Sequence, residues 1–346
     1  MNTQLNIPTC SNINVDGLGH IFDRSLGQCL STKLDDVLNG RKIIFSIEEK
    51  SLFPVDGWGI RSNPYCTTAI TTIQPIKEST VISAVDSSSI QVAETEEGAL
   101  YAIKCGIALA ITSQALMHFK IGPILFYLSE ETIRHSEIDH RLARLVLFDS
   151  DSAKRLIRVR VERAVQAELS NNIKKSIILV DGSLKSSLFE YKNHDIKKVV
   201  ENCYLYKNSM IGLSKTTKLK VLDRISSPLA KIRGPAYMDI EAIIKSLIRN
   251  TVGNNLLVKL GTDNSPVLRA DVITANNSDK DELLGKLLGN DSITRGYPET
   301  LRLAHHISTF TNTEISCLRG HILSNYDVTE LASEDIRRTL LGSIPV

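Results

Sequence analysis

Two aspartates in this chain follow short apolar runs of the kind that form buried strands. Asp86 comes after residues 81–85 and Asp181 after residues 176–180, and each is followed by residues that favour a turn. Either one alone is a common turn signal, but a carboxylate at the end of a core strand is also held rigidly within reach of solvent. Two carboxylates on neighbouring strands repel each other unless a cation neutralises them. The pair therefore predicts a divalent metal site.

Glu162 is a third acid that could join this site. It lies in the middle of a predicted helix, within Arg-Val-Arg-Val-Glu-Arg-Ala, and this helix precedes the second aspartate strand. The alternative interpretation is an exposed acid that pairs with Arg158 one helical turn earlier. If the helix packs across the sheet, Glu162 points toward the same metal, and Glu168 is then the fallback acid nearer the helix end.

Tyr297, His305 and Lys215 complete the set of candidate residues. Tyr297 precedes Pro298 at a predicted helix start, and His305 lies about two turns further on, on a similar face. A neutral imidazole nitrogen suits manganese or zinc, so either His305 or His306 could be a metal ligand or a proton carrier. Lys215 follows a strand without the glycine spacing of a P-loop, which leaves a phosphate contact or a surface lysine as its interpretations.

Hydrophobic periodicity predicts the elements that position these residues. Between residues 80 and 128 the pattern indicates three successive strands, which favours an antiparallel meander. Helices and strands alternate afterwards, and the C-terminal part is helical. The expected strands are 81–86, 100–113, 117–128, 177–181, 210–214, 256–259 and 267–273, and the expected helices are 153–169, 195–206, one opened by Pro298, and 328–341.

This order of elements predicts an α/β fold in which helices flank a mixed sheet. A meander followed by alternating helices and parallel strands is typical of the ribonuclease H-like arrangement. In that arrangement the first strand lies centrally beside the fourth. Asp86 and Asp181 would then become spatial neighbours.

Length and composition fit one elaborated domain with an added segment at its beginning. The chain has 346 residues and is 42% hydrophobic, enough to bury a full core. Residues 1–78 carry turn signals such as Asp16-Gly17 and Asn63-Pro64 and one strand-like run at 41–47, so we expect an N-terminal extension or small subdomain there and a main domain over 79–346. No apolar run approaches the ~18 residues of a membrane span, and no signal-peptide pattern is visible. We therefore expect a cytoplasmic protein with no membrane partner and with reduced cysteines.

Charge is distributed unevenly, although the net charge is only +2. Residues 151–235 hold 18 Lys and Arg against 8 Asp and Glu, which gives this segment a net charge of +10. Such a segment is often a solvated helical face. Around two metal-binding carboxylates, a basic field would instead suit a polyanion such as nucleic acid.

Five short motifs contain the candidate residues. They are Val-Asp-Ser-Ser-Ser at Asp86, Val-Glu-Arg-Ala at Glu162, Leu-Val-Asp-Gly-Ser-Leu at Asp181, Gly-Leu-Ser-Lys at Lys215, and Gly-Tyr-Pro with Ala-His-His at Tyr297 to His306. In this order they resemble the motifs of the NurA nucleases, and the resemblance spans residues 80–323. Each motif is weak alone, whereas five in sequence on a compatible topology form a much stronger resemblance. One departure lies at Ser87, where the family usually has glycine, and serine tolerates a turn with positive φ less easily.

The resemblance implies a manganese-dependent DNA nuclease on a ribonuclease H-like core, with Mg²⁺ as the alternative metal. It implies that Asp86 and Asp181 hold the metal and that Glu162 completes the acidic site. Tyr297 and His305 would close the site from the C-terminal helix, because the first of the two histidines has the family's spacing from the tyrosine.

The resemblance also implies single-strand endonuclease and 5′ to 3′ exonuclease activity, on single-stranded DNA and duplex ends, during end resection and repair. The implied partners are a second copy of the chain, in a homodimer, and a HerA-type hexameric ATPase. Lys215 would contact the DNA backbone in this setting.

Two other classes of protein remain as alternatives. Actin-like sugar kinases and ATPases share this core, but their phosphate loops need glycine in both aspartate turns, and here Ser87 and Ser88 occupy the first. A non-catalytic relative that only binds DNA or a partner is the second alternative, and the glycine-to-serine change favours it. A manganese-dependent assay on single-stranded and duplex DNA ends would separate the three.

Overall fold

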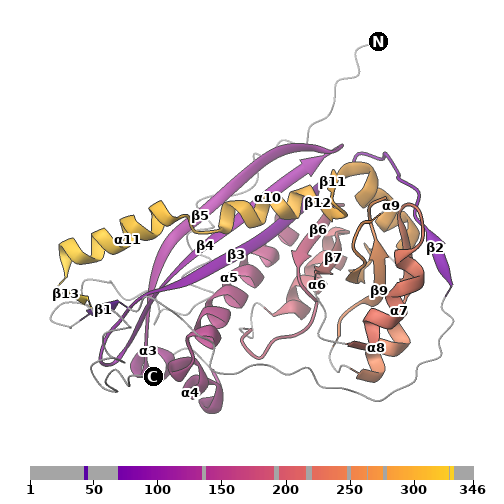
Figure 1. Ribbon diagram of the computed structural model, residues 1–346. Helices are drawn as coiled ribbons and strands as arrows, with labels where there is room; N and C mark the ends of the chain where they lie inside the picture. Colours follow the sequence, from indigo (N-terminus) through magenta and orange to yellow (C-terminus); the bar gives the residue numbers. More distant parts are fainter. Residues whose placement is uncertain are drawn as a thin grey trace, which may run out of the picture.

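One large mixed sheet of eleven strands dominates the computed structural model of the protein (Figure 1). The structure describes residues 43–45, 69–134, 138–190, 195–215, 220–247, 251–262, 264–275, 279–326 and 328–330. The turn signals predicted at Asp16-Gly17 and Asn63-Pro64 lie outside these residues. Within the described part, no helix is long and apolar enough to cross a membrane.

An antiparallel meander forms the first part of the sheet, as predicted. Its strands are β3 (Ile82–Glu94), β4 (Gly98–Ile111) and β5 (Gln114–Ser129). β4 pairs with β3 on one side and with β5 on the other. The turn between β3 and β4 is closed by a hydrogen bond of 2.8 Å from the Thr95 N–H to the Gly98 carbonyl.

β3 does not end at Asp86, so the prediction of a turn at this position is wrong. Asp86 lies opposite Gly106 of β4 and Ser87 opposite Cys105, and the strand continues to Glu94. The serine run contains no glycine or proline, and pairing with β4 outweighs its local preference for a turn. Ser87 is therefore extended, and it needs no glycine-like backbone.

Two parallel strands extend the sheet beside β3, which confirms that the first strand of the meander lies next to the fourth strand. They are β6 (Ile177–Asp181) and β7 (Ser209–Ser214). β6 pairs with β3 only over Ile82–Val85, where Val85 is level with Val180. Asp86 and Asp181 consequently lie side by side, as the sequence predicted.

The remaining strands complete the sheet on both sides. Beyond β7 the order is β10, β9, β8 and β2, all antiparallel to their neighbours. β1 joins β3 at Glu94 and pairs in parallel with β13. Their bounds are β1 (Ile43–Phe45), β2 (Ile70–Thr72), β8 (Ala236–Asp239), β9 (Asn254–Lys259), β10 (Leu268–Ile273) and β13 (Val328–Glu330).

Two of these strands bear on predictions near the chain ends. β13 is a strand where a helix over 328–341 was expected, so that prediction is wrong at its start, and residues 331–346 lie outside the described part. β1 and β2 belong to residues 1–78, and both join the main sheet. The division at residue 78 remains a prediction.

Helices cover the two faces of the meander and β6. Alternate strand residues serve opposite faces. Val85 belongs to the same hydrophobic cluster as Leu156 of α5, whereas Ala84 belongs to the cluster that contains Ala304 of α10. The helices are α3 (Glu130–Arg134), α4 (His140–Phe148), α5 (Ser150–Asn172), α6 (Ile196–Tyr206), α7 (Lys220–Ala230), α8 (Glu241–Leu247), α9 (Lys280–Asn290), α10 (Glu299–Ser308) and α11 (Asn312–Asn325). A short hairpin of β11 (Ile293–Thr294) and β12 (Tyr297–Pro298) precedes α10.

Candidate active site

Asp86 projects from β3 toward α10 and meets two side chains of that helix. Nδ1 of His305 lies 2.6 Å from Oδ2 of Asp86, and the Ser308 hydroxyl donates to the same oxygen at 3.1 Å. These two residues are three apart on the helix, so both face the strand. Asp86 is buried, whereas the side chain of His305 is 58% exposed. An imidazole whose Nδ1–H donates to a carboxylate keeps Nε2 available for a metal.

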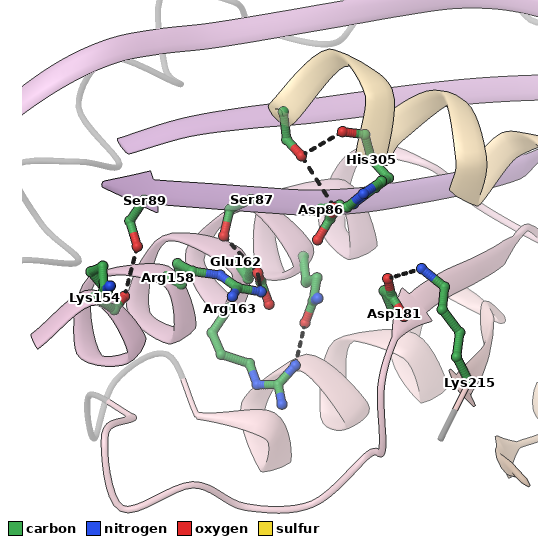
Figure 2. Close-up of polar contacts among 12 residues, drawn as sticks. Asp86, Ser87, Ser89, Lys154, Arg158, Glu162, Arg163, Asp181, Lys215 and His305 are labelled. Carbon is green, nitrogen blue, oxygen red and sulfur yellow. Dashed lines mark hydrogen bonds and ion pairs between the residues drawn. The ribbon is translucent and has the colours of Figure 1, made fainter. Parts of the chain in front are cut away.

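Asp181 ends β6 on the same face and is held by two further predicted residues. The Tyr297 hydroxyl donates to Oδ1 at 3.2 Å. Nζ of Lys215 lies 2.8 Å from Oδ2 (Figure 2). The ammonium of Lys215 also lies 4.8 Å from the centre of the Tyr297 ring. Burial, with the charges of Asp181 and Asp86, raises the pKa of Tyr297, so its phenol stays a hydrogen-bond donor.

Asp86, Asp181 and His305 together form a potential metal site. Each offers one ligand atom, and these atoms all lie within 4.8 Å of one another. Two carboxylate oxygens and one imidazole nitrogen are a donor set that suits Mn²⁺, and the carboxylates also suit Mg²⁺. The residues present therefore fit the predicted metal.

Glu162 lies on the other face of β3, outside this group of three. Its carboxylate accepts a hydrogen bond of 2.6 Å from the hydroxyl of Ser87, the strand residue next to Asp86 (Figure 2). Arg158 is 3.7 Å away on the same helix, as the alternative interpretation expected, but the Glu162 side chain is only 15% exposed and not the exposed acid of that interpretation. Burial is the main cause that raises the pKa of Glu162, and the Asp86 charge acts in the same direction. Ser87, which stands where the resemblance led us to expect glycine, is thus the direct partner of Glu162.

The position of α10 depends on a glycine beneath it. Gly106 of β4 lies opposite Asp86, and a Cβ atom there would approach the carbonyl oxygen of Ala304 to 2.3 Å. The backbone of α10 therefore rests directly on β4. α10 turns its buried residues Leu301, Ala304 and Ser308 toward the sheet.

The turn after Asp181 is fixed by a buried ion pair in the sheet. Gly182 has a φ of +116°, which favours glycine. Two residues later, the Leu184 N–H donates to Oδ2 of Asp271 at 2.9 Å. Asp271 is itself paired with Arg269 at 3.0 Å, and both are buried. This pair holds the chain that leads out of the aspartate strand.

Ser308 and Asp271 were not singled out from the sequence, although both support the site. Ser308 has a usable signal, because it follows His305 by three residues on a predicted helix. Asp271 interrupts an apolar strand, and a charge inside such a run indicates a paired group. Its partner across the sheet, the Leu184 amide, has no local sequence signal.

One protein-family model matches most of the described chain. The model of the NurA domain matches residues 80–309. The chain belongs to this family. Membership confirms the resemblance carried by the five motifs and the enzyme class that it implied, a DNA nuclease. A search of curated proteins gives no match.

Solved structures similar to this chain include two NurA structures and one structure of Endonuclease V. The crystal structure of the NurA nuclease from Sulfolobus solfataricus is 15% identical, with a TM-score of 0.46, over 74% of this chain and 88% of that one. A structure of NurA bound to dAMP and manganese is 10% identical, with a TM-score of 0.43, over 73% and 90%. The catalytic domain of human Endonuclease V is 12% identical, with a TM-score of 0.31, over 79% and 92%.

Proposed function

We propose that this NurA family member is a metal-dependent DNA nuclease whose cation is held by Asp86, Asp181 and His305. The observation that carries the proposal is the approach of their ligand atoms to within 4.8 Å on the α10 face of the sheet. Mn²⁺ is the proposed metal, because an imidazole beside two carboxylates suits it better than Mg²⁺. Two close carboxylates without an added cation would repel each other.

The side chains around the cation have separate tasks in this proposal. A bound divalent cation would polarise the phosphate and lower the pKa of a nearby water. Asp86 holds the His305 ring in place through Nδ1, and Ser308 in turn orients Asp86. Tyr297 fixes Asp181 through its hydroxyl, and its buried ring is unsuited to stacking on a base. Lys215, 46% exposed, can contact a DNA phosphate beside Asp181.

Glu162 acts from the opposite face in this proposal. β6 ends at Asp181, so the edge of β3 beyond Val85 is uncovered by β6. A groove at this edge is lined by both Glu162 and Asp181. The carboxylate of Glu162, oriented by Ser87, is thus available to the same phosphodiester as a further ligand or as a proton acceptor.

The finer assignments rest on the family resemblance and on the strand order. We infer a ribonuclease H-like core from the order β5, β4, β3, β6, β7, with β6 parallel to β3 and β7 parallel to β6. We further infer single-strand endonuclease and 5′ to 3′ exonuclease activity in cytoplasmic end resection and repair. A homodimer that works with a HerA-type hexameric ATPase belongs to the same inference.

The direct test compares wild-type protein with Asp181→Asn on labelled single-stranded and duplex DNA ends, with Mn²⁺, Mg²⁺ or EDTA. Wild type should cleave with Mn²⁺, and Asp181→Asn should lose at least about 100-fold in rate. Asp139→Asn is a matched control, because Asp139 caps α4 and asparagine caps equally well. Undiminished cleavage by Asp181→Asn would refute the metal site, and no cleavage by wild type would favour a protein that only binds DNA.

A further inference from the structure

A groove leads away from Asp181 along α5. It has a volume of about 1150 Å³ and lies between α5 and the chain from Gly182 to Phe189. We name it the α5 groove. Its wall on α5 includes Lys154, Arg155 and Arg158, and its other wall includes Lys185 and Leu188. Asp181 and Glu162 lie at its catalytic end.

Hydrogen bonds and an ion pair hold the second wall of the α5 groove in place at both ends. Leu184 is bound to Asp271, as described above, and Nε of Arg160 donates to the Phe189 carbonyl at 3.2 Å. Arg163 pairs with Glu190 at 2.7 Å, and both side chains are almost fully buried. The groove therefore has a fixed width, set by contacts between α5 and the chain after Asp181.

Cations dominate the part of the groove that lies away from the catalytic end. Lys154 is paired with Asp151 at 2.9 Å, so these two charges cancel. Arg155 is exposed and lies 5.6 Å from the centre of the Phe189 ring. A contact with a neutral ring does not cancel its positive charge. Lys185 is exposed on the opposite wall, and the Arg158 side chain is 47% exposed. A polyanion would thus meet net positive charge along the groove, because Lys154 offsets Asp151, and would meet unbalanced carboxylates toward Asp181 and Glu162.

Leu188 adds an apolar contact to this basic surface. Its side chain lines the groove and is 87% exposed. The outer surface of a duplex offers phosphates and sugars, whereas a single strand also offers the faces of its bases. An exposed apolar side chain between cations is therefore suited to a single strand.

We propose that the α5 groove binds a single-stranded segment of nucleic acid on its way to the metal site. Arg155, Arg158 and Lys185 contact successive phosphates, and Leu188 packs against a base. This inference rests on the proposed nuclease function and adds the path of the single strand and the residues that contact it.

Binding without cleavage tests the path. Anisotropy of a labelled oligothymidylate is measured in EDTA over a range of salt concentrations, with wild type, Arg155→Gln and Lys185→Gln. Each substitution should weaken binding and reduce the slope of log K against log salt by about 0.7, the value for one lost contact to a single strand. Lys197→Gln is the matched control, because Lys197 is exposed on α6 and does not line the groove. Equal slopes for all four proteins would overturn the path.

Strandedness is tested with Leu188→Ser. This variant should bind the single strand less tightly than wild type with an unchanged salt slope, and its affinity for a blunt duplex should stay the same. Equal losses on both substrates, or no loss on the single strand, would overturn the role of Leu188. All variants lie at exposed positions, and thermal unfolding followed by circular dichroism checks that each one folds.

Cleavage separates failure of this inference from failure of the proposed function. With Mn²⁺, Arg155→Gln and Lys185→Gln should cleave dithymidine, which is too short to fill the groove, at the wild-type rate, and a long oligothymidylate more slowly at low substrate concentration. If wild type cleaves DNA but the groove variants match Lys197→Gln on the long substrate, only the groove assignment fails. If wild type cleaves neither substrate, the nuclease function fails.

Discussion

The two faces of β3 differ although adjacent residues supply them. On the α10 face, Asp86 joins Asp181 and His305 in one group of ligand atoms. On the α5 face, Ser87 holds Glu162 by a single hydrogen bond. Because strand side chains alternate, a step of one residue separates a metal-binding carboxylate from the partner of a helix carboxylate. Candidate ligands that lie close in space thus need not form one ligand shell.

The strongest test of the α10 face compares its two adjacent histidines. His305→Gln should lower the Mn²⁺-dependent cleavage rate by about 100-fold or more, since even the loss of an outer partner of a metal ligand costs roughly 10- to 100-fold. His306→Gln should cleave at close to the wild-type rate, because His306 is exposed on the same helix and lies outside the group of three ligands. Initial rates on labelled single-stranded DNA decide the point. Equal losses in the two variants would contradict the preference for His305.

Glu162→Gln tests whether the α5 face shares the metal. We expect cleavage to fall by roughly 10- to 100-fold, because a carboxylate beside the phosphodiester is lost. The affinity for Mn²⁺, measured by electron paramagnetic resonance titration, should fall less than in Asp86→Asn, because the group of three ligand atoms stays intact. An equal loss of Mn²⁺ affinity in both variants would make Glu162 a full member of the ligand set.

Ser87→Ala tests the hydrogen bond between β3 and Glu162, and its expected effect is smaller. Removing the hydroxyl leaves the half-buried carboxylate of Glu162 without this partner, and the free energy of unfolding should fall by about 1 kcal/mol. The matched control is Ser89→Ala, on the same face, where the hydroxyl donates only to the Lys154 carbonyl at 3.2 Å. Urea unfolding measures both. Cleavage should drop in Ser87→Ala alone, and a drop in both variants would point to a general effect on β3.

The last prediction concerns stability alone, at the start of α10, and leaves cleavage unchanged. The carboxylate of Asp291 accepts the Thr300 N–H at 3.3 Å, and burial raises the pKa of Asp291 from 3.8 to about 6. The folded protein therefore keeps a proton that the unfolded chain has lost, so stability falls as pH rises from about 4 to about 6. Asp291→Asn should remove a slope of up to about 1.4 kcal/mol per pH unit from urea unfolding in this window. Asp195→Asn, which alters the cap of α6, should leave the slope in place.

The sequence predicted the elements that carry the site better than their contacts. The run at 177–181 is apolar and bounded by a turn glycine, so local chemistry alone defines β6. The run that begins at Val81 has no such boundary, and its end at Glu94 follows from pairing with β4 along its length. The short strand β2 has little local signal and depends on β8 for its pairing.

In the candidate site, too, the sequence predicted the residues better than the contacts between residues that are distant in the chain. Asp86, Asp181 and His305 were found from residue type and motif order, and the structure brings them together. Glu162 was expected beside them, but which face of β3 it meets depends on how α5 packs, and periodicity does not give that. Lys215 was expected on the DNA backbone. Its ion pair with Asp181 joins residues that lie 34 positions apart, and no local sequence pattern predicts it.

Because α10 rests on Gly106, a protein of this fold could keep all three metal ligands and still lose its activity. Any side chain at that position would push the helix outward and carry His305 away from Asp86, with all three ligands still present in the sequence. A relative with a larger residue there would pass an inventory of metal ligands and yet lack a working centre. In other members of the family, the residue at the position of Gly106 would thus indicate lost cleavage even where all the metal-binding aspartates and the histidine are kept.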